Sequence, residues 1–91
     1  MDAQEYIEGH LKGHRNQLVP IVLEYGWIVP DTLAYELARD EAGRRYGVTV
    51  IGGDPPRIQK DLSDLFPRQQ DAHNHISKLQ AEMNPPPDEM H

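Results

Sequence analysis

The sequence has no cysteine and few aromatic residues. Its 91 residues include one tryptophan, one phenylalanine and four tyrosines, so a single small core must be built mainly from aliphatic side chains. Without cysteine the chain can form neither a disulfide framework nor a thiolate zinc site, which suits a reducing compartment. No run of about 18 apolar residues and no basic leader are present, so we expect a cytoplasmic protein with no membrane partner.

Basic residues are also scarce. Nine Lys and Arg residues stand against fifteen Asp and Glu residues, and the net charge of −6 disfavours non-specific attraction to nucleic acid or anionic lipid. Only residues 39–60 carry a positive net charge, and five basic residues lie there: Arg39, Arg44, Arg45, Arg57 and Lys60. These side chains either solvate a helix face or form a binding surface.

Helical spacing of apolar residues dominates the first half of the chain. It predicts a helix or arm over residues 2–16, with Asp2 as its N-cap, and a core helix over about residues 18–25. Pro30 and Asp31 predict the start of another helix, which is expected to run over about residues 31–46.

The second half begins with a β-prone segment. Residues 27–29 and 48–51 are short apolar runs that predict at most a two-stranded β element. Helices are expected over about residues 56–66 and 68–84, either as two helices broken at Pro67 or as one helix bent there.

These elements predict one mostly α-helical domain of four to five helices. The domain spans residues 1–84, with a helix-turn-helix centre at residues 18–66, and a disordered, proline-rich tail follows at residues 85–91.

The centre at residues 18–66 resembles helix-turn-helix and winged-helix DNA-binding domains. Its last predicted helix is similar to the recognition helices of DeoR-type and arginine-repressor-type regulators. Those helices carry a hydrophobic residue, two polar or basic residues, an aspartate and a leucine in that order, here Ile58, Gln59, Lys60, Asp61 and Leu62.

The resemblance implies a double-stranded DNA partner and assigns roles to seven residues. Four side chains of the last predicted helix would face the major groove: Arg57, Gln59, Lys60 and Ser63. Three arginines of the preceding helix would hold phosphates: Arg44, Arg45 and Arg39.

A heptad seam marks the C-terminal helix. Its residues, Ala72, Ile76, Leu79 and Met83, alternate by four and three. Because two heptads are too few for an isolated coiled coil, the seam either packs on this domain or pairs with a second chain as a homodimer interface.

Evidence for catalysis or metal binding is weak. His10 and His14 share a helix face at the spacing of two zinc ligands, but Leu11 stands where a metalloprotease needs glutamate, so we expect solvated histidines and no metal. No catalytic constellation or cofactor motif is present, and we expect no enzyme. Trp27 is expected at the centre of the core, whereas an exposed Trp27 would indicate a partner-binding hot spot.

Two functions follow from these observations. The first is a small cytoplasmic DNA-binding transcriptional regulator; the alternative is an acidic protein-binding adaptor or inhibitor without DNA contact, as often encoded by phages and mobile elements. One surface property separates them, namely whether four basic residues share one exposed face that Asp61 and Asp64 do not interrupt: Arg57, Lys60, Arg44 and Arg45.

Overall fold

The computed structural model describes residues 1–11 and 17–84. In chain order the elements are α1 (Ala3–Leu11), β1 (Ile21–Val29), β2 (Leu33–Arg39), β3 (Tyr46–Gly52), β4 (Arg57–Ile58), β5 (Asp64–Phe66) and α2 (Gln69–Met83). The prediction of a mostly α-helical fold with four to five helices is therefore wrong. The described chain forms an α+β fold with two helices and an antiparallel sheet of five strands.

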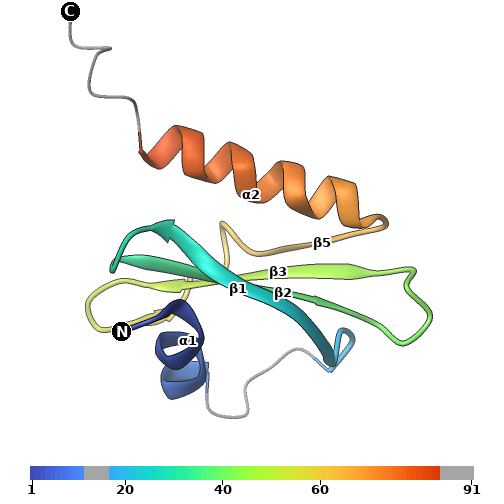
Figure 1. Ribbon diagram of the computed structural model, residues 1–91, viewed down its shortest axis with the longest axis horizontal. Helices are drawn as coiled ribbons and strands as arrows, with labels where there is room; N and C mark the ends of the chain where they lie inside the picture. Colours follow the sequence, from blue (N-terminus) through green and yellow to red (C-terminus); the bar gives the residue numbers. More distant parts are fainter. Residues whose placement is uncertain (12–16, 85–91) are drawn as a thin grey trace, which may run out of the picture.

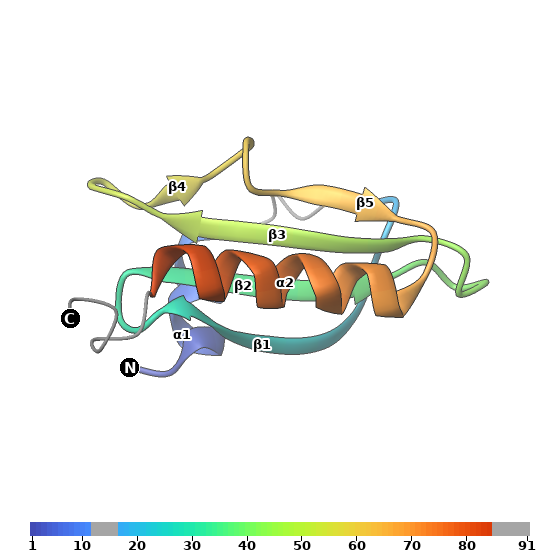
Figure 2. The ribbon, with the colours of Figure 1, turned by 90° about the horizontal axis from the view of Figure 1, so that it is seen from above.

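The sheet is a meander whose last two strands share one neighbour. Strands β1, β2 and β3 pair in that order, and β4 and β5 both pair with β3, at its end and at its beginning respectively (Figure 2). Residues 27–29 and 48–51 are strand residues as predicted, but they do not form a two-stranded pair because β2 lies between them.

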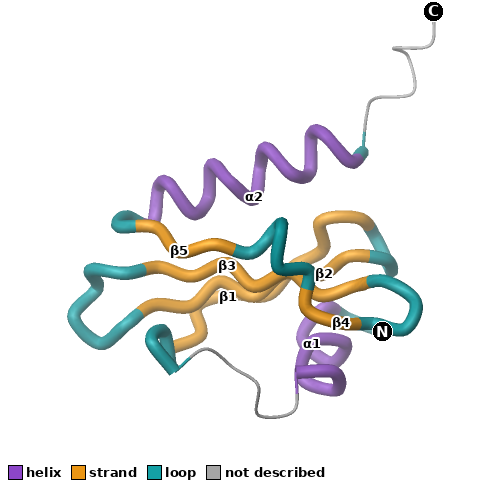
Figure 3. Tube along the Cα trace, turned by 180° about the vertical axis from the view of Figure 1, so that it is seen from behind, coloured by secondary structure: helices purple, strands orange, loops and turns teal. Residues whose placement is uncertain are grey.

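The two helices cover opposite faces of this sheet (Figure 1; Figure 3 shows the same layers from behind). The core on the α2 side contains Ile28, Tyr35, Leu37, Val48, Val50, Ala72, Ile76 and Leu79. The core on the α1 side is smaller and contains Ala3, Ile7, Leu11, Ala34 and Ile51. Each helix therefore stabilises one face of the sheet by burying apolar side chains.

Residues 31–46 and 56–66, which were predicted as the two helices of a helix-turn-helix, form strands and turns. The first segment contains β2 and a hairpin loop at residues 40–45, and the second contains β4, an arch at residues 59–63 and β5. The core helix predicted over about residues 18–25 is also wrong, because strand β1 begins at Ile21, and none of residues 18–66 is helical. All five residues from Ala34 to Ala38 are buried because a helix covers each face of β2.

The predictions at the two ends of the chain agree better with the structure. The Asp2 carboxylate accepts a hydrogen bond from the Glu5 backbone N–H at 2.8 Å, which confirms the predicted N-cap. The predicted C-terminal helix is present as α2. It begins after Pro67, which lies in the short connection between β5 and α2. The predicted tail at residues 85–91 and part of the predicted arm, residues 12–16, lie outside the described residues.

Candidate functional site

The basic residues assigned to DNA lie at opposite ends of β3. Arg44 and Arg45 belong to the hairpin loop that leads into β3, whereas Arg57 pairs with Gly52 at its far end. A strand of seven residues separates the two positions by about 20 Å. Lys60 lies between them, in the arch that joins β4 to β5.

Acidic residues interrupt this row of basic residues. Asp61 and Asp64 are both exposed, and Asp64 pairs with Val48 of β3, between Arg44 and Arg45 at one end of the strand and Arg57 at the other. The exposed basic surface is therefore broken, which is the arrangement expected of the protein-binding alternative.

Two of the predicted base-contacting residues, Gln59 and Ser63, make hydrogen bonds within the chain. The Gln59 side-chain amide donates to the Gly52 carbonyl at 2.7 Å, and the Ser63 hydroxyl donates to the Gln59 carbonyl at 2.9 Å. The Ser63 oxygen also accepts the Val50 backbone N–H at 2.9 Å. The Ser63–Val50 bond joins the arch to β3 at a residue that pairs with neither β4 nor β5, and the Gln59–Gly52 bond joins it at the end of β3.

The arginines near the hairpin differ in their contacts. Arg39 donates to the backbone carbonyls of Asp40 and Glu41 at 2.8 and 3.2 Å, so it helps to hold the loop. Arg44 and Arg45 line a hollow of about 250 Å³ together with Leu65, Phe66 and Pro67.

Asp40 organises the same hairpin loop. Its carboxylate accepts the backbone N–H groups of Arg44 and Arg45 at 2.8 and 3.2 Å. Partial desolvation raises the pKa of Asp40, but these hydrogen bonds, that from Gly43 and the Arg45 charge outweigh it, so the pKa lies below its ordinary value. The carboxylate therefore stays ionised and fixes the loop that carries both arginines.

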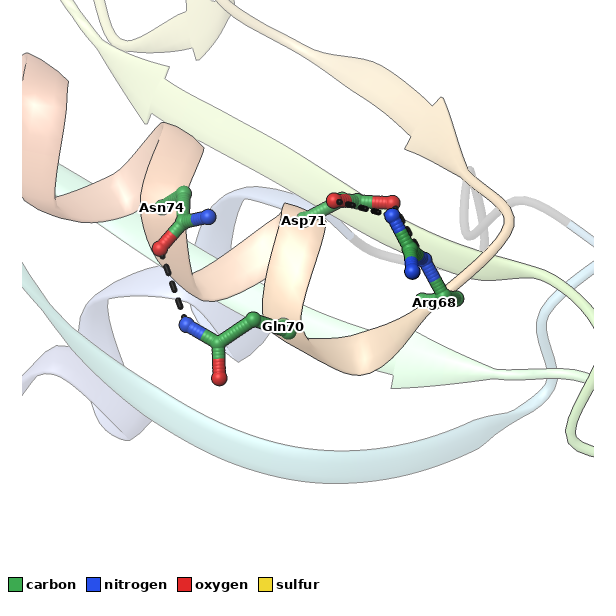
Figure 4. A network of polar contacts seen from close by, with 4 residues as sticks. All are labelled: Arg68, Gln70, Asp71 and Asn74. Carbon is green, nitrogen blue, oxygen red and sulfur yellow. Dashed lines mark hydrogen bonds and ion pairs between the residues drawn. The ribbon is translucent and has the colours of Figure 1, made fainter.

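The predicted dimer seam packs on the sheet of its own chain. Ala72, Ile76 and Leu79 are buried in the α2-side core, and Met83 is partly buried against it. The start of α2 instead presents polar pairs: Arg68 bonds Asp71 at 3.2 Å and Gln70 bonds Asn74 at 2.9 Å (Figure 4). The seam residues therefore already have partners within the monomer.

A polar network that the sequence did not indicate joins β1, β2 and α2. The Tyr35 hydroxyl donates to Glu24 at 2.7 Å, and the His73 ring lies 3.0 Å from the other carboxylate oxygen. Gly26 leaves space for the Tyr35 ring, since a Cβ at position 26 would lie 2.6 Å from that ring. Burial and the bonded Glu24 carboxylate raise the pKa of Tyr35, which keeps the phenol protonated.

We expect this network to make stability depend on pH. Burial raises the pKa of Glu24, but the hydrogen bonds from Tyr35 and His73 and the His73 charge lower it below the ordinary 4.5. A carboxyl group with a lowered pKa stabilises the fold above its unfolded value and loses this contribution as the pH falls through its folded value. Glu24→Gln should therefore be less stable than the wild type at pH 7, and the difference should shrink below pH 4.5.

Urea unfolding of both proteins at pH 7 and pH 3 measures this difference. Glu82→Gln, on the exposed side of α2, is the matched control and should unfold like the wild type at both pH values. A gap for Glu24→Gln that stays constant down to pH 3 would contradict the role of the network.

Both edges of the sheet are poorly suited to strand addition. Strand β1 has register shifts at Val22/Glu24 and at Trp27/Val29, which twist it within nine residues. Gln80 of α2 and the C-cap residue Asn84 donate side-chain hydrogen bonds to the carbonyls of Trp27 and Ile28 respectively. The other edge is occupied by β4, the arch and β5. Protected edges of this kind disfavour pairing with another chain.

A hollow beside α1 is lined by one aromatic residue and two aspartates. It measures about 510 Å³ and lies between α1 and two turns, at residues 30–32 and 53–56. The residues that line it are Tyr6, Asp31, Thr32, Gly53, Asp54 and Pro56. Trp27, expected at the centre of the core, is half-buried beside this hollow, with its ring 5.3 Å from that of Tyr6.

The sequence contained a signal for one wall of this hollow. Val29-Pro30-Asp31-Thr32 forms a turn in which the Thr32 N–H donates to the Val29 carbonyl at 3.0 Å and Asp31 has φ of 59°. Proline followed by a residue with positive φ is typical of a type II turn between two strands. No pattern indicated that Tyr6 or Asp54 would join it.

In the described part of the chain, no three His, Asp or Glu residues lie close enough to hold a metal ion. His14, one of the two histidines with zinc-ligand spacing, lies outside this part, and the His10 ring is bonded to the Tyr6 carbonyl at 2.7 Å. Neither described helix is long and apolar enough to cross a membrane.

Comparison with protein-family models, with curated proteins and with solved structures finds no match. The candidate site therefore rests on its own geometry.

Proposed function

We propose that the protein is a small cytoplasmic protein-binding module, an adaptor or inhibitor. It binds a basic partner through the end of the sheet that carries Asp31 and Asp54. The observation that carries this proposal is the 510 Å³ hollow, which is lined by one tyrosine and two aspartates and by no lysine or arginine. A net charge of −6 steers a basic surface toward the molecule, and the lack of cysteine suits the cytoplasm.

The distribution of charge supports a protein partner over DNA. A protein that follows a DNA backbone needs cations spaced along one surface. Here Arg44 and Arg45 are separated from Arg57 by the length of β3, and Asp64 lies between them. An acidic side chain in that position would repel phosphate.

DNA binding stays a prediction, and one observation favours it. Within the described chain, the guanidinium groups of Arg44 and Arg45 have no ion pair or hydrogen bond, so they are available to an anion such as phosphate. The DNA-binding prediction no longer has a recognition helix, because the residues expected to contact bases in the major groove form β4, an arch and β5.

Fluorescence anisotropy can compare the two functions directly. We expect the protein to bind a labelled peptide of alternating arginine and glycine with a Kd in about the 0.1–1 mM range, because a few exposed ion pairs supply little energy. Binding should weaken as salt is raised, since exposed charges are screened. A citrulline peptide, neutral but of the same shape, is the control and should not bind.

A labelled 25-base-pair duplex of random sequence tests the alternative in the same assay, beside an Arg57→Glu, Lys60→Glu double variant. We expect no duplex binding at tens of micromolar protein. Salt-sensitive duplex binding that is lost in the double variant would favour the DNA-binding function instead. Equal binding of the arginine and citrulline peptides, or of neither, would refute a charge-directed protein partner.

A further inference from the structure

The 510 Å³ hollow is assembled from three segments that are distant in sequence. Tyr6 comes from α1, Asp31 and Thr32 from the turn between β1 and β2, and Asp54 from the turn between β3 and β4. The two turns lie at the same end of the sheet because Leu33 and Gly52 are directly paired (Figure 1). The site therefore exists only in the folded chain.

The aromatic wall is held in place before any ligand arrives. The Tyr6 ring lies 5.3 Å from the Trp27 ring and 4.8 Å from the His10 ring, and His10 also bonds the Tyr6 carbonyl at 2.7 Å. An aromatic ring fixed by its neighbours loses little conformational entropy when a partner stacks on it.

The two aspartates that line the hollow lack counter-charges. Among the described residues, neither Asp31 nor Asp54 has a side-chain hydrogen bond or ion pair. Arg57, close by in the chain, pairs with Gly52 and so lies on the α2 face of the sheet, away from α1. The hollow therefore has an uncompensated negative charge and favours a cation.

The volume of the hollow, its aromatic residue and its aspartates together favour one kind of cation. A volume of 510 Å³ is far larger than a bare ion needs and matches the lower range of pockets that hold organic groups. A guanidinium is planar, stacks on aromatic rings and has five N–H donors that can reach carboxylates on two sides. An ammonium is more strongly hydrated and has no flat face to place on Tyr6.

We propose that this hollow binds the guanidinium group of an arginine side chain on the protein partner. The guanidinium stacks on Tyr6 and donates hydrogen bonds to Asp31 from one turn and Asp54 from the other. This inference rests on the proposed protein-binding function and names the chemical group that the site recognises.

Two double variants that each remove two negative charges allow a matched comparison. Asp31→Asn, Asp54→Asn removes both carboxylates from the hollow, and asparagine tolerates the positive φ of residue 31. Asp61→Asn, Glu82→Gln removes the same charge from exposed positions in the arch and on α2, outside the hollow. Both variants raise the net charge equally, so a non-specific charge effect would weaken both alike.

The test is an NMR titration of the ¹⁵N-labelled full chain with the alternating arginine peptide. We expect the amide shifts to change mainly at Tyr6, Thr32 and Gly53. The hollow variant should bind about tenfold more weakly, since two exposed ion pairs are lost, whereas the control variant should bind within about twofold of the wild type. The equivalent lysine peptide should bind more weakly than the arginine peptide.

Other results would overturn the site or the function separately. Peptide-induced shifts confined to residues 59–64, with equal affinity in both variants, would refute the hollow and leave a charge-directed binding function standing. No binding of either basic peptide would refute both. Shifts at the hollow on raising the protein concentration alone would assign it to a second copy of this chain and overturn the arginine partner.

Discussion

Gly52→Ala should lower the free energy of unfolding by about 3 kcal/mol, the upper part of the range for overpacked interiors. Gly52 is buried at the end of β3, and a Cβ there would lie 2.6 Å from the Thr32 carbonyl oxygen and 2.4 Å from the Leu33 side chain. The side chain can rotate away, but the carbonyl belongs to the backbone of the turn that carries Asp31. Relief therefore requires the turn to move away from β3. Urea unfolding followed by circular dichroism measures the loss.

The same substitution at Gly9 is the matched control. Gly9 lies inside α1, and a Cβ there would meet nothing within 4 Å. Alanine should stabilise the helix by about 0.5–1 kcal/mol, because glycine loses more backbone entropy on folding. The two changes are thus predicted to have opposite signs, and a Gly52→Ala protein as stable as Gly9→Ala would contradict the contact between β3 and the turn.

Ile76→Ala should destabilise the monomer by about 3 kcal/mol, independently of protein concentration. The side chain is only 4 % exposed and packs into the α2-side core against the sheet, so its loss leaves a cavity. If the heptad seam instead held two chains together, the main result would be dissociation, and stability would depend on concentration. Urea midpoints at two concentrations that differ tenfold separate these outcomes.

Ser77→Ala is the control for this prediction. Ser77 is the next residue of α2 and is exposed, so the substitution should change stability by less than about 0.5 kcal/mol. A wild-type midpoint that rises with protein concentration and an Ile76→Ala midpoint that does not would place the seam between two chains.

The two terminal helices could be predicted because each lies on the surface of the sheet. Only one side of α1 and α2 is buried, and their apolar residues therefore repeat with the helical period. Asp2 is also a strong local signal, since its side chain caps the helix that follows.

Strand β2 could not be identified from periodicity. A strand that faces water on one side alternates apolar and polar residues, but β2 has a helix on each side and is buried at every position from Ala34 to Ala38. Its apolar residues flank the buried Glu36, and Leu33, Ala34, Leu37 and Ala38 also fit the helical period, so the segment cannot be distinguished by period from a helix. Pro30 and Asp31 added to the error, because the same residue types begin helices and form turns.

The sequence identified the basic residues but not their positions relative to one another. Arg44, Arg45 and Arg57 lie close together in a helix-turn-helix, whereas an antiparallel pairing sends them to opposite ends of β3. The hollow depends on contacts between Tyr6 and two turns separated by more than twenty residues each. Long-range contacts of this kind leave no local pattern, and a single sequence gives no other information about them.

The most direct test of this structure and of the site built on it is a nuclear Overhauser spectrum of the uniformly labelled protein. Antiparallel pairing predicts cross-strand contacts between Leu37 and Val48, and packing of α1 predicts methyl contacts between Ile7 and Ile51. Sequential amide–amide contacts running through residues 31–46 without these cross-strand contacts would mean that the segment is a helix. They would restore the helix-turn-helix and remove the hollow.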